Sequence, residues 1–398
     1  MTATGPGQVR IASVDIFRAL TMLLMIFVND LWSLHDIPQW LEHTQADYDG
    51  MGLADVVFPA FLFIVGLSVP FAIKGRISRG ETAGKISLHI LSRSLALITM
   101  GFFHVNLGNM QPGLMPLSRQ VYEIIMTVAF FLIWNIYPGN GGVLGISSRW
   151  LRIMGIAALI MLASLYKGGS MENPVWMRPY WWGILGLIGW AYLVSAFIYL
   201  FFRNILWLLA LFLLLFCLLN VWEFSSLFGI LPKFRLIISA SNYSLVLCGI
   251  FASAIFQKFT SREKWEWKYA GILILLAVVC ILFGFWVRPL GGISKIKATP
   301  SWTAICAGIS FAVYGILFIM ADKYRITRWA GIIAPAGRST LTCYLIPYVV
   351  YPVMTLVGWK WPEALTSGIP GLIKTLVFAW IIVWITGLLE KIHVKLKI

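Results

Sequence analysis

One polar segment between two long apolar runs contains a histidine and is bracketed by an amide and a carboxylate. Asn29 stands near the end of the first run, His43 within the polar segment, and Asp55 near the start of the second run. If both runs cross a membrane as helices, the three side chains can converge at one membrane face. An imidazole takes a proton, a carboxylate fixes its tautomer, and an amide polarises a carbonyl group. The pattern therefore predicts a general-base site made of His43, Asp55 and Asn29.

Simpler interpretations of the same residues stay open at this point. Asp55 can cap the helix that it opens, and His43 can be a solvated loop residue. His35, in the same polar segment, and His104, at the end of a later apolar run, are the next candidates for the base. Spacing alone does not choose between these interpretations.

A second group of charged residues lies at the other end of the first apolar run. Asp15 and Arg18 are three positions apart and therefore share one helix face. Charges within a membrane span are costly unless they pair, so we expect an ion pair, which either lines a pathway or is a plain interfacial pair. Helical rise places Asn29 about 21 Å from Asp15. The two polar groups are therefore expected at opposite faces of the bilayer.

Transmembrane helices are the elements that must position these residues. Of the 398 residues, 60% are hydrophobic and 12% are charged, whereas a typical soluble protein is about 25% charged. Apolar runs of about 20 residues, the length that crosses a hydrocarbon core, recur along the whole chain. We predict an all-α polytopic membrane protein with one domain, residues 1–398, and no soluble domain; roughly 10–12 helices are expected. The predicted spans lie near residues 15–34, 55–73, 88–104, 120–137, 151–166, 181–202, 205–221, 239–257, 269–287, 301–320, 336–357 and 371–389.

The positive charge is distributed as expected for a membrane protein. The net charge is +15, and the positive-inside rule explains it without a nucleic-acid partner. We predict an integral protein of a bacterial inner membrane, with both termini cytoplasmic and the acidic loop 35–54 periplasmic. The basic segments that support this topology are 74–93, 258–268, 322–328 and 391–398.

Other kinds of chemistry find no support in the sequence. The five cysteines lie inside apolar runs and lack the spacing of metal ligands, so no metal site is predicted. The sequence contains no Walker A loop, no HExxH and no GxSxG.

Several segments resemble the membrane core of the heparan-α-glucosaminide N-acetyltransferase family. "SVDIFRALTMLLMIFVND" and "LADVVFPAFLFIVGLSV" are similar to the family's S-x-D-x-x-R-G, V-N and A/T-D-x-V-F-P-x-F-x-F-I-x-G motifs, with an outer-loop histidine between them. "ISKIKATPSW", residues 293–302, resembles the later I-N-K-x-x-W-T-P-S-Y motif, and "GRSTLTCY", residues 337–344, resembles G-M-N-S-x-x-x-Y. The positions that match are Ser13, Asp15, Arg18, Val28, Asn29, His43, Asp55, Pro59, Gly66, Lys295, Thr299, Pro300, Ser301 and Tyr344.

This resemblance implies a reaction and its participants. Acetyl-CoA would donate an acetyl group from the cytoplasmic side to an amino sugar or oligosaccharide on the outer side, within a lipid bilayer. His43 would be the catalytic residue, supported by Asp55 and Asn29. Direct transfer with His43 as base is preferred to an acetyl-histidine intermediate, and a homodimer is left open. The candidate contacts to acetyl-CoA are Asp15, Arg18, Lys295 and Ser301.

The chain also departs from the family pattern. The motif-bearing part is 10–105, an extra hairpin is predicted at 118–167, and the C-terminal part is 180–398. Segment 182–192 lacks the Gln-Arg pair of the family's G-V-L-Q-R motif, and segment 222–239 lacks its D-P-E-G motif. The resemblance therefore says more about the reaction type than about the acceptor, and N- and O-acetylation both stay open.

Two other classes of protein stay open beside the acetyltransferase. A secondary transporter of a sugar or an acylated glycan precursor fits the number of spans, but such proteins often contain internal repeats, and the sequence has none that is evident. A non-catalytic membrane scaffold would not need a histidine, a carboxylate and an amide together. Acetyl transfer that depends on His43 would separate the first class from the others.

Overall fold

The computed structural model describes residues 11–137, 147–224, 240–259 and 265–398. The predicted segments 258–268 and 222–239 and the N-terminus therefore lie partly outside the described residues. The long helices and their short companions are α1 Ala12–Asp30, α2 Leu53–Ile77, α3 Ala83–Leu107, α4 Arg119–Trp134, α5 Ser148–Leu165, α6 Gly183–Phe202, α7 Leu206–Phe224, α8 Ala240–Phe259, α9 Trp265–Trp286, α10 Pro300–Phe318, α11 Ala334–Arg338, α12 Thr340–Leu345, α13 Pro347–Val357 and α14 Gly368–Lys391. Single-turn helices are η1 Leu31–Ser33, η2 Gln39–Leu41, η3 Pro112–Leu114, η4 Arg288–Leu290, η5 Ile319–Lys323, η6 Arg328–Gly331 and η7 Glu363–Leu365, and the strands are β1 Gly168–Gly169 and β2 Pro174–Val175.

The predicted all-α polytopic architecture is confirmed. Within the described ranges, 11 helices are long and apolar enough to cross a membrane. The predicted span 120–137 corresponds to α4, a helix of 16 residues that is not among them. The predicted span 336–357 is divided into α11, α12 and α13. Pro347 begins α13, and proline ends the preceding helix because it lacks an N–H and its ring clashes with the turn before it.

The chain forms two compact units built from interleaved segments. Unit 1 comprises Met1–Thr21, Pro38–Ser94 and Trp190–Ala334, and unit 2 comprises Met22–Ile37, Leu95–Gly189 and Pro335–Ile398. The single domain over residues 1–398 stays a prediction, and the two units are described separately below.

Close helix packing forms the core of unit 1. A Cβ on Gly66 of α2 would lie 1.9 Å from the carbonyl oxygen of Val246, and one on Gly249 of α8 would lie 2.0 Å from that of Phe63. Only glycine permits such an approach, as in many pairs of membrane helices. The ring of Phe63 also meets Phe311 of α10 edge-on, at 4.9 Å between centroids. This packing fixes α2, which carries Asp55 at its start.

One end of unit 1 is defined by the beginning of α1. The carboxylate of Asp322, in η5, accepts hydrogen bonds from the backbone N–H groups of Ala12 at 2.7 Å and Ser13 at 3.1 Å. The ammonium group of Lys323 lies 3.4 Å from the centre of the Trp267 ring, near the start of α9. The first residues of α1 and α9 and the end of α10 therefore lie at the same end of the unit, as the alternating directions of the predicted spans require.

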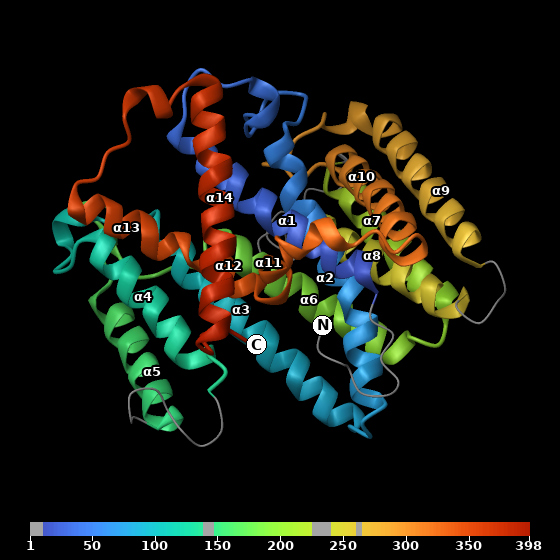
Figure 1. Cartoon of the computed structure of the whole chain (residues 1–398), viewed down its shortest axis with the longest axis horizontal. Helices are drawn as coiled ribbons and strands as arrows, with labels where there is room; N and C mark the ends of the chain where they lie inside the picture. The colour runs from blue at the N-terminus through green and yellow to red at the C-terminus, as the bar shows by residue number, and fades with distance from the viewer. Residues whose placement is uncertain (1–10, 138–146, 225–239, 260–264) are drawn as a thin grey trace. The chain divides into compact units, whose positions relative to one another are not determined.

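Unit 2 contains the helix pair at the predicted hairpin 118–167 (Figure 1). Helices α4 and α5 pack along each other, and a Cβ on Gly155 would lie 2.9 Å from the carbonyl oxygen of Ala129. The end of α4 also binds the C-terminal residues, since the backbone N–H of Lys395 donates to the side chain of Asn135 at 2.7 Å. The connection between α4 and α5, residues 138–146, lies outside the described residues.

Candidate active site

The polar segment before α2 folds back over the start of that helix. Gly52 is the N-cap residue of α2, and a Cβ at this position would lie 2.0 Å from the carbonyl oxygen of Glu42. The close approach of the two backbones therefore requires glycine at position 52. Asp55 stands at the third position of the helix, and its carboxylate accepts the backbone N–H of Gly52 at 3.1 Å. Asp55 thus caps α2, as the simpler interpretation expected, but this is only one of its contacts.

The carboxylate of Asp55 binds the imidazole of His43. Oδ1 of Asp55 lies 2.7 Å from Nδ1 of His43, and Oδ2 accepts the backbone N–H of Thr44 at 3.1 Å and its hydroxyl at 3.0 Å. Only 1% of the Asp55 side chain is exposed, whereas 48% of the His43 side chain is. A carboxylate surrounded by donors makes Nδ1 of His43 the protonated nitrogen, so Nε2 of the neutral ring keeps its lone pair. The pair has the geometry of an oriented general base.

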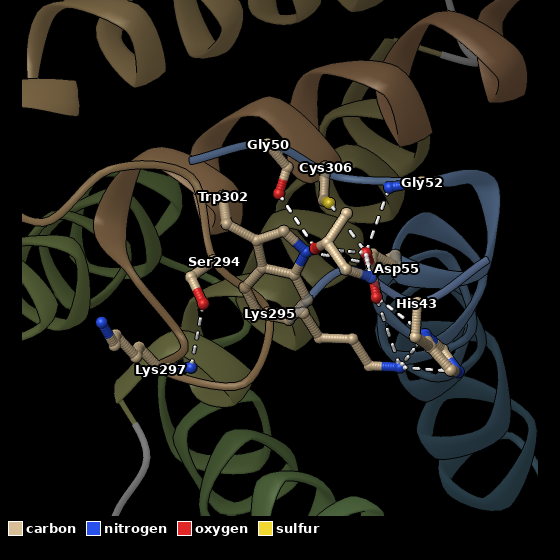
Figure 2. A network of polar contacts seen from close by, with 10 residues as sticks. His43, Gly50, Gly52, Asp55, Ser294, Lys295, Lys297, Trp302 and Cys306 are labelled. Carbon is tan, nitrogen blue, oxygen red and sulfur yellow. Dashed lines mark hydrogen bonds and ion pairs between the residues drawn. The ribbon is translucent and has the colours of Figure 1, made fainter. Parts of the chain in front are cut away.

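Lys295 brings an amine to the same imidazole (Figure 2). Its Nζ lies 3.1 Å from Nδ1 and 3.4 Å from Nε2 of His43, and 3.9 Å from Oδ1 of Asp55. The side chain is 24% exposed. Burial lowers the pKa of Lys295, and the negative charge of Asp55 opposes this effect only in part. The sequence motif pointed to Lys295, but its contact with His43 was not predicted.

The segment that carries Lys295, residues 288–299, is held against the polar segment by further contacts. The carboxylate of Asp49 accepts the backbone N–H of Ile293 at 2.7 Å and the guanidinium of Arg288 at 3.0 Å. The hydroxyl of Ser294 donates to the carbonyl of Ala46 at 3.0 Å. The hydrogen bond from Ile293 holds the pKa of Asp49 below its usual value. Asp49 was counted in the sequence only as part of an acidic loop, because nothing local indicates its distant partner.

The first turn of α10 packs against the backbone of Asp55. Thr299 caps this helix by accepting the N–H of Trp302, and Pro300 takes the first helical position, which explains the Thr-Pro-Ser motif as a helix start. The indole N–H of Trp302 donates to the backbone carbonyl of Asp55 at 3.1 Å. Ser301 is fully buried, and its hydroxyl has no hydrogen-bond partner among the described residues. Its role as a contact to acetyl-CoA stays a prediction.

Asp15 and Arg18 form the ion pair that their spacing predicts. The distance between the Arg18 guanidinium and the Asp15 carboxylate is 3.2 Å, and the guanidinium also donates to the hydroxyl of Ser68 at 2.6 Å. Ser68 follows Asp55 by thirteen positions on α2, which corresponds to about 20 Å of helix. Unit 1 therefore carries a basic group far along α2 from the His43 imidazole.

The remaining candidates belong to unit 2. Asn29 is exposed near the end of α1. The backbone N–H of His35 donates to the carbonyl of Thr366 at 2.9 Å, and the ring of His104 lies 4.2 Å from that of Tyr348. The convergence of Asn29 with His43 stays a prediction, and His35 and His104 stay the alternatives for the base.

The fold and this site define a polytopic membrane protein that holds an oriented histidine next to a buried carboxylate and a lysine. Comparison with known proteins agrees with the resemblance seen in the motifs. Residues 10–133 match the family model described as "Heparan-alpha-glucosaminide N-acetyltransferase, catalytic". This N-terminal part, which contains His43 and Asp55, is thus similar to the catalytic region of that family, and the resemblance is confirmed over these residues.

Two curated relatives carry the same name. Heparan-alpha-glucosaminide N-acetyltransferase of Mus musculus is 30% identical over 141 residues, which is 33% of this chain and 21% of the relative. The Homo sapiens protein is 34% identical over 97 residues, which is 24% of this chain and 14% of the relative. The alignments therefore span about a fifth or less of the length of these relatives. The match to the family model ends at residue 133 and does not include Lys295.

Proposed function

We propose that this protein is a membrane acetyltransferase that moves an acetyl group from acetyl-CoA to an amino sugar or a related glycan acceptor. The observation that carries this proposal is the 2.7 Å contact between His43 and the buried carboxylate of Asp55, inside the segment that is similar to a catalytic region. A half-exposed imidazole fixed by a buried carboxylate is suited to accept a proton from an incoming nucleophile.

In the proposed reaction, His43 acts on the acceptor amine. Nε2 takes the amine proton while the nitrogen attacks the thioester carbonyl, and Asp55 stabilises the imidazolium that forms. The C–S bond breaks, and His43 returns the proton to the leaving thiolate. Asn29 is proposed to donate a hydrogen bond to the carbonyl oxygen as it becomes negative. We favour direct transfer, because an acetylated His43 would be exposed to water.

The donor is proposed to enter along α2. CoA carries several negative charges, which the guanidinium of Arg18 can bind, and Arg18 meets Ser68 about 20 Å of helix away from Asp55. A long flexible arm is what would connect a charged group held there to a thioester near His43. Asp15 orients Arg18 in this proposal. The place of Lys295 beside His43 favours a role at the acetyl end, and Ser301 is kept as a further candidate contact.

Arg18→Ala should weaken acetyl-CoA binding, measured by calorimetry on the purified protein in nanodiscs. A charge-assisted contact contributes about 1.5–3 kcal/mol, so we expect a loss of roughly tenfold or more in affinity. Arg79→Ala is the control. Arg79 is an exposed residue paired with Glu81, so its replacement should leave the affinity for acetyl-CoA unchanged. If Arg18→Ala binds acetyl-CoA as tightly as the parent protein does, Arg18 is not part of the donor site.

The sidedness of the reaction rests on the predicted topology, with both termini in the cytoplasm and loop 35–54 in the periplasm. Gln45 is exposed in this loop, so a cysteine introduced there should react with an impermeant thiol reagent added to spheroplasts of a bacterial host. The parent protein serves as the background control for its own five cysteines. If the introduced cysteine is labelled only after the spheroplasts are lysed, loop 35–54 faces the cytoplasm and the predicted orientation is wrong.

The test of the function is an assay of the purified protein in nanodiscs with acetyl-CoA and glucosamine-terminated oligosaccharides. Free CoA thiol and an acetylated oligosaccharide should appear together, in equal amounts. A transporter or a scaffold would release no thiol above the rate of spontaneous hydrolysis. A panel of amino-sugar and hydroxyl acceptors in the same assay would distinguish N- from O-acetylation, and a panel without any acetylated product would contradict the proposal.

A further inference from the structure

The amine of Lys295 occupies the position that the proposed reaction requires for an acceptor amine. A primary amine must approach within hydrogen-bond distance of the unprotonated nitrogen of the base. Nζ of Lys295 lies 3.4 Å from Nε2 of His43 and 3.1 Å from Nδ1, and Figure 2 shows its side chain extending to the imidazole ring. An amine of the protein itself thus already lies beside the base, with its shorter distance to Nδ1, the nitrogen that Asp55 binds.

The surroundings of Lys295 favour a reactive amine. Burial lowers the pKa of Lys295, so more of the side chain is neutral near neutral pH than for an exposed lysine. The ion pair with Asp55 is loose, at 3.9 Å, because the carboxylate is already bound by His43, Thr44 and Gly52. A neutral, desolvated lysine is the form that acts as a nucleophile.

Lys297 provides an internal comparison on the same segment. Its ammonium group lies 2.8 Å from the carboxylate of Asp47, which is 94% exposed, and 44% of the Lys297 side chain is exposed. Lys297 is thus the more exposed amine, but its ion pair keeps it protonated, so it reports only acetylation that exposure to acetyl-CoA causes. Loss of Lys295 acetylation in His43→Ala, and not the contrast with Lys297 alone, would show that the modification needs the base.

We propose that Lys295 is an acetylation site of this protein and that its amine accepts the acetyl group when no external acceptor is bound. This inference rests on the proposed function. The Lys295 nitrogen forms a bond to the acetyl carbonyl carbon, and the thioester C–S bond breaks. One proton of the amine passes to His43 and then to the thiolate, so the products are N-acetyl-lysine at position 295 and CoA with a free thiol.

Acetylation of Lys295 would stop turnover. The amide that forms is neutral and is not a nucleophile, and its acetyl group lies next to His43, where an external amine has to enter. Because no second group in the proposed reaction removes it, the modification would persist. A bound acceptor would displace Lys295 from the imidazole and protect it, so the protein would be inactivated by its donor only when acceptor is absent.

The experiment is incubation of the purified full-length protein with acetyl-CoA in nanodiscs, followed by peptide mass spectrometry. Lys295 should become acetylated in most molecules, and Lys297 should stay at the level of a sample with heat-inactivated protein. His43→Ala should abolish the modification of Lys295, and an excess of a working acceptor should suppress it. Transfer measured after preincubation with acetyl-CoA should fall at least tenfold relative to a sample that was not preincubated.

Lys295→Arg is the decisive variant, because a guanidinium stays protonated and does not act as a nucleophile. Each variant is compared with its own sample that was not preincubated, so a lower starting activity does not matter. Lys295→Arg should lose no further activity, and Lys297→Arg should be inactivated as the parent protein is. If the parent protein transfers acetyl groups to an acceptor but Lys295 stays unmodified in the incubation without acceptor, this inference is wrong and the proposed function stands. If neither reaction occurs, the proposed function fails as well.

Discussion

Replacing His43 with alanine should lower acetyl transfer to an amino sugar by roughly 10²–10⁴-fold, the usual cost of losing a general base. The variant removes the nitrogen that receives the amine proton, whereas the proposed donor contact at Arg18 stays in place. Acetyl-CoA binding should therefore remain close to that of the parent protein. The measurement is the rate of CoA thiol release with saturating acceptor, together with calorimetry of acetyl-CoA binding.

Two further variants test the assignment. Asp55→Asn keeps the size of the side chain but places an NH₂ group among donors, so the tautomer of His43 is no longer fixed and transfer should also fall. His35→Ala changes a histidine of the same polar segment and should leave transfer unchanged. If His43→Ala transfers acetyl groups at nearly the normal rate, the assignment is wrong, and His35 and His104 become the candidates for the base.

The pairing of His43 with Asp55 was predictable because His43 lies within a short polar segment that Asp55 ends. A separation of only twelve positions along the chain keeps the two side chains at the same membrane face, whatever the rest of the fold does. The ion pair between Asp15 and Arg18 was predictable for a similar reason, since a helix places residues three apart on one face. Local geometry was sufficient in both cases.

The contact of Lys295 with His43 could not be predicted from spacing. The two residues are 252 positions apart, and their approach depends on how α2, α8, α9 and α10 pack, with Gly66 and Gly249 allowing the closest contact. The family motif marked Lys295 but not its partner. Asp49 was counted only as part of the acidic loop, because its partners in the segment 288–293 become neighbours only after the helices have packed.

Of the twelve predicted spans, eleven correspond to helices of the described residues that are long and apolar enough to cross a membrane, and span 120–137 does not; the interruption of span 336–357 was not predictable. Hydrophobicity predicts one continuous span over residues 336–357, whereas the structure divides this segment into helices α11, α12 and α13. Pro347 was visible in the sequence; proline is common enough in membrane helices, however, that its presence alone did not separate a kink from a break.

Unit 2 contains a buried ion pair that the proposed chemistry does not use. The ammonium group of Lys374, on α14, lies 2.9 Å from the carboxylate of Asp30 at the end of α1, and the two side chains are 5% and 4% exposed. The carboxylate also accepts the hydroxyl of Tyr351 at 2.8 Å and that of Thr375 at 2.7 Å, and Lys374 donates to Ser33 at 2.9 Å. These contacts join α1, α13 and α14 within the unit.

Removing one partner of this pair should destabilise the protein strongly. Lys374→Met leaves the Asp30 carboxylate buried without its counter-charge, and Asp30→Asn does the same to the ammonium group, at a cost of about 3–5 kcal/mol each. Both variants should unfold at clearly lower temperature than the parent protein in the same detergent. Lys297→Met, which breaks an ion pair with an exposed carboxylate, should leave the unfolding temperature nearly unchanged.

The double variant Asp30→Asn/Lys374→Met separates the charge from the shape of this cluster. If burial of an uncompensated charge is the main cost, removing both charges should restore most of the lost stability. The amide oxygen still accepts one of the Tyr351 and Thr375 hydroxyls, the NH₂ group can donate to the oxygen of the other, and methionine fills the space of the lysine stem. A double variant as unstable as the sum of the single variants would mean that the two charges act independently, and that burial of an uncompensated charge is not the main cost. Single variants that unfold like the parent protein would show that neither charge is buried as the structure places it.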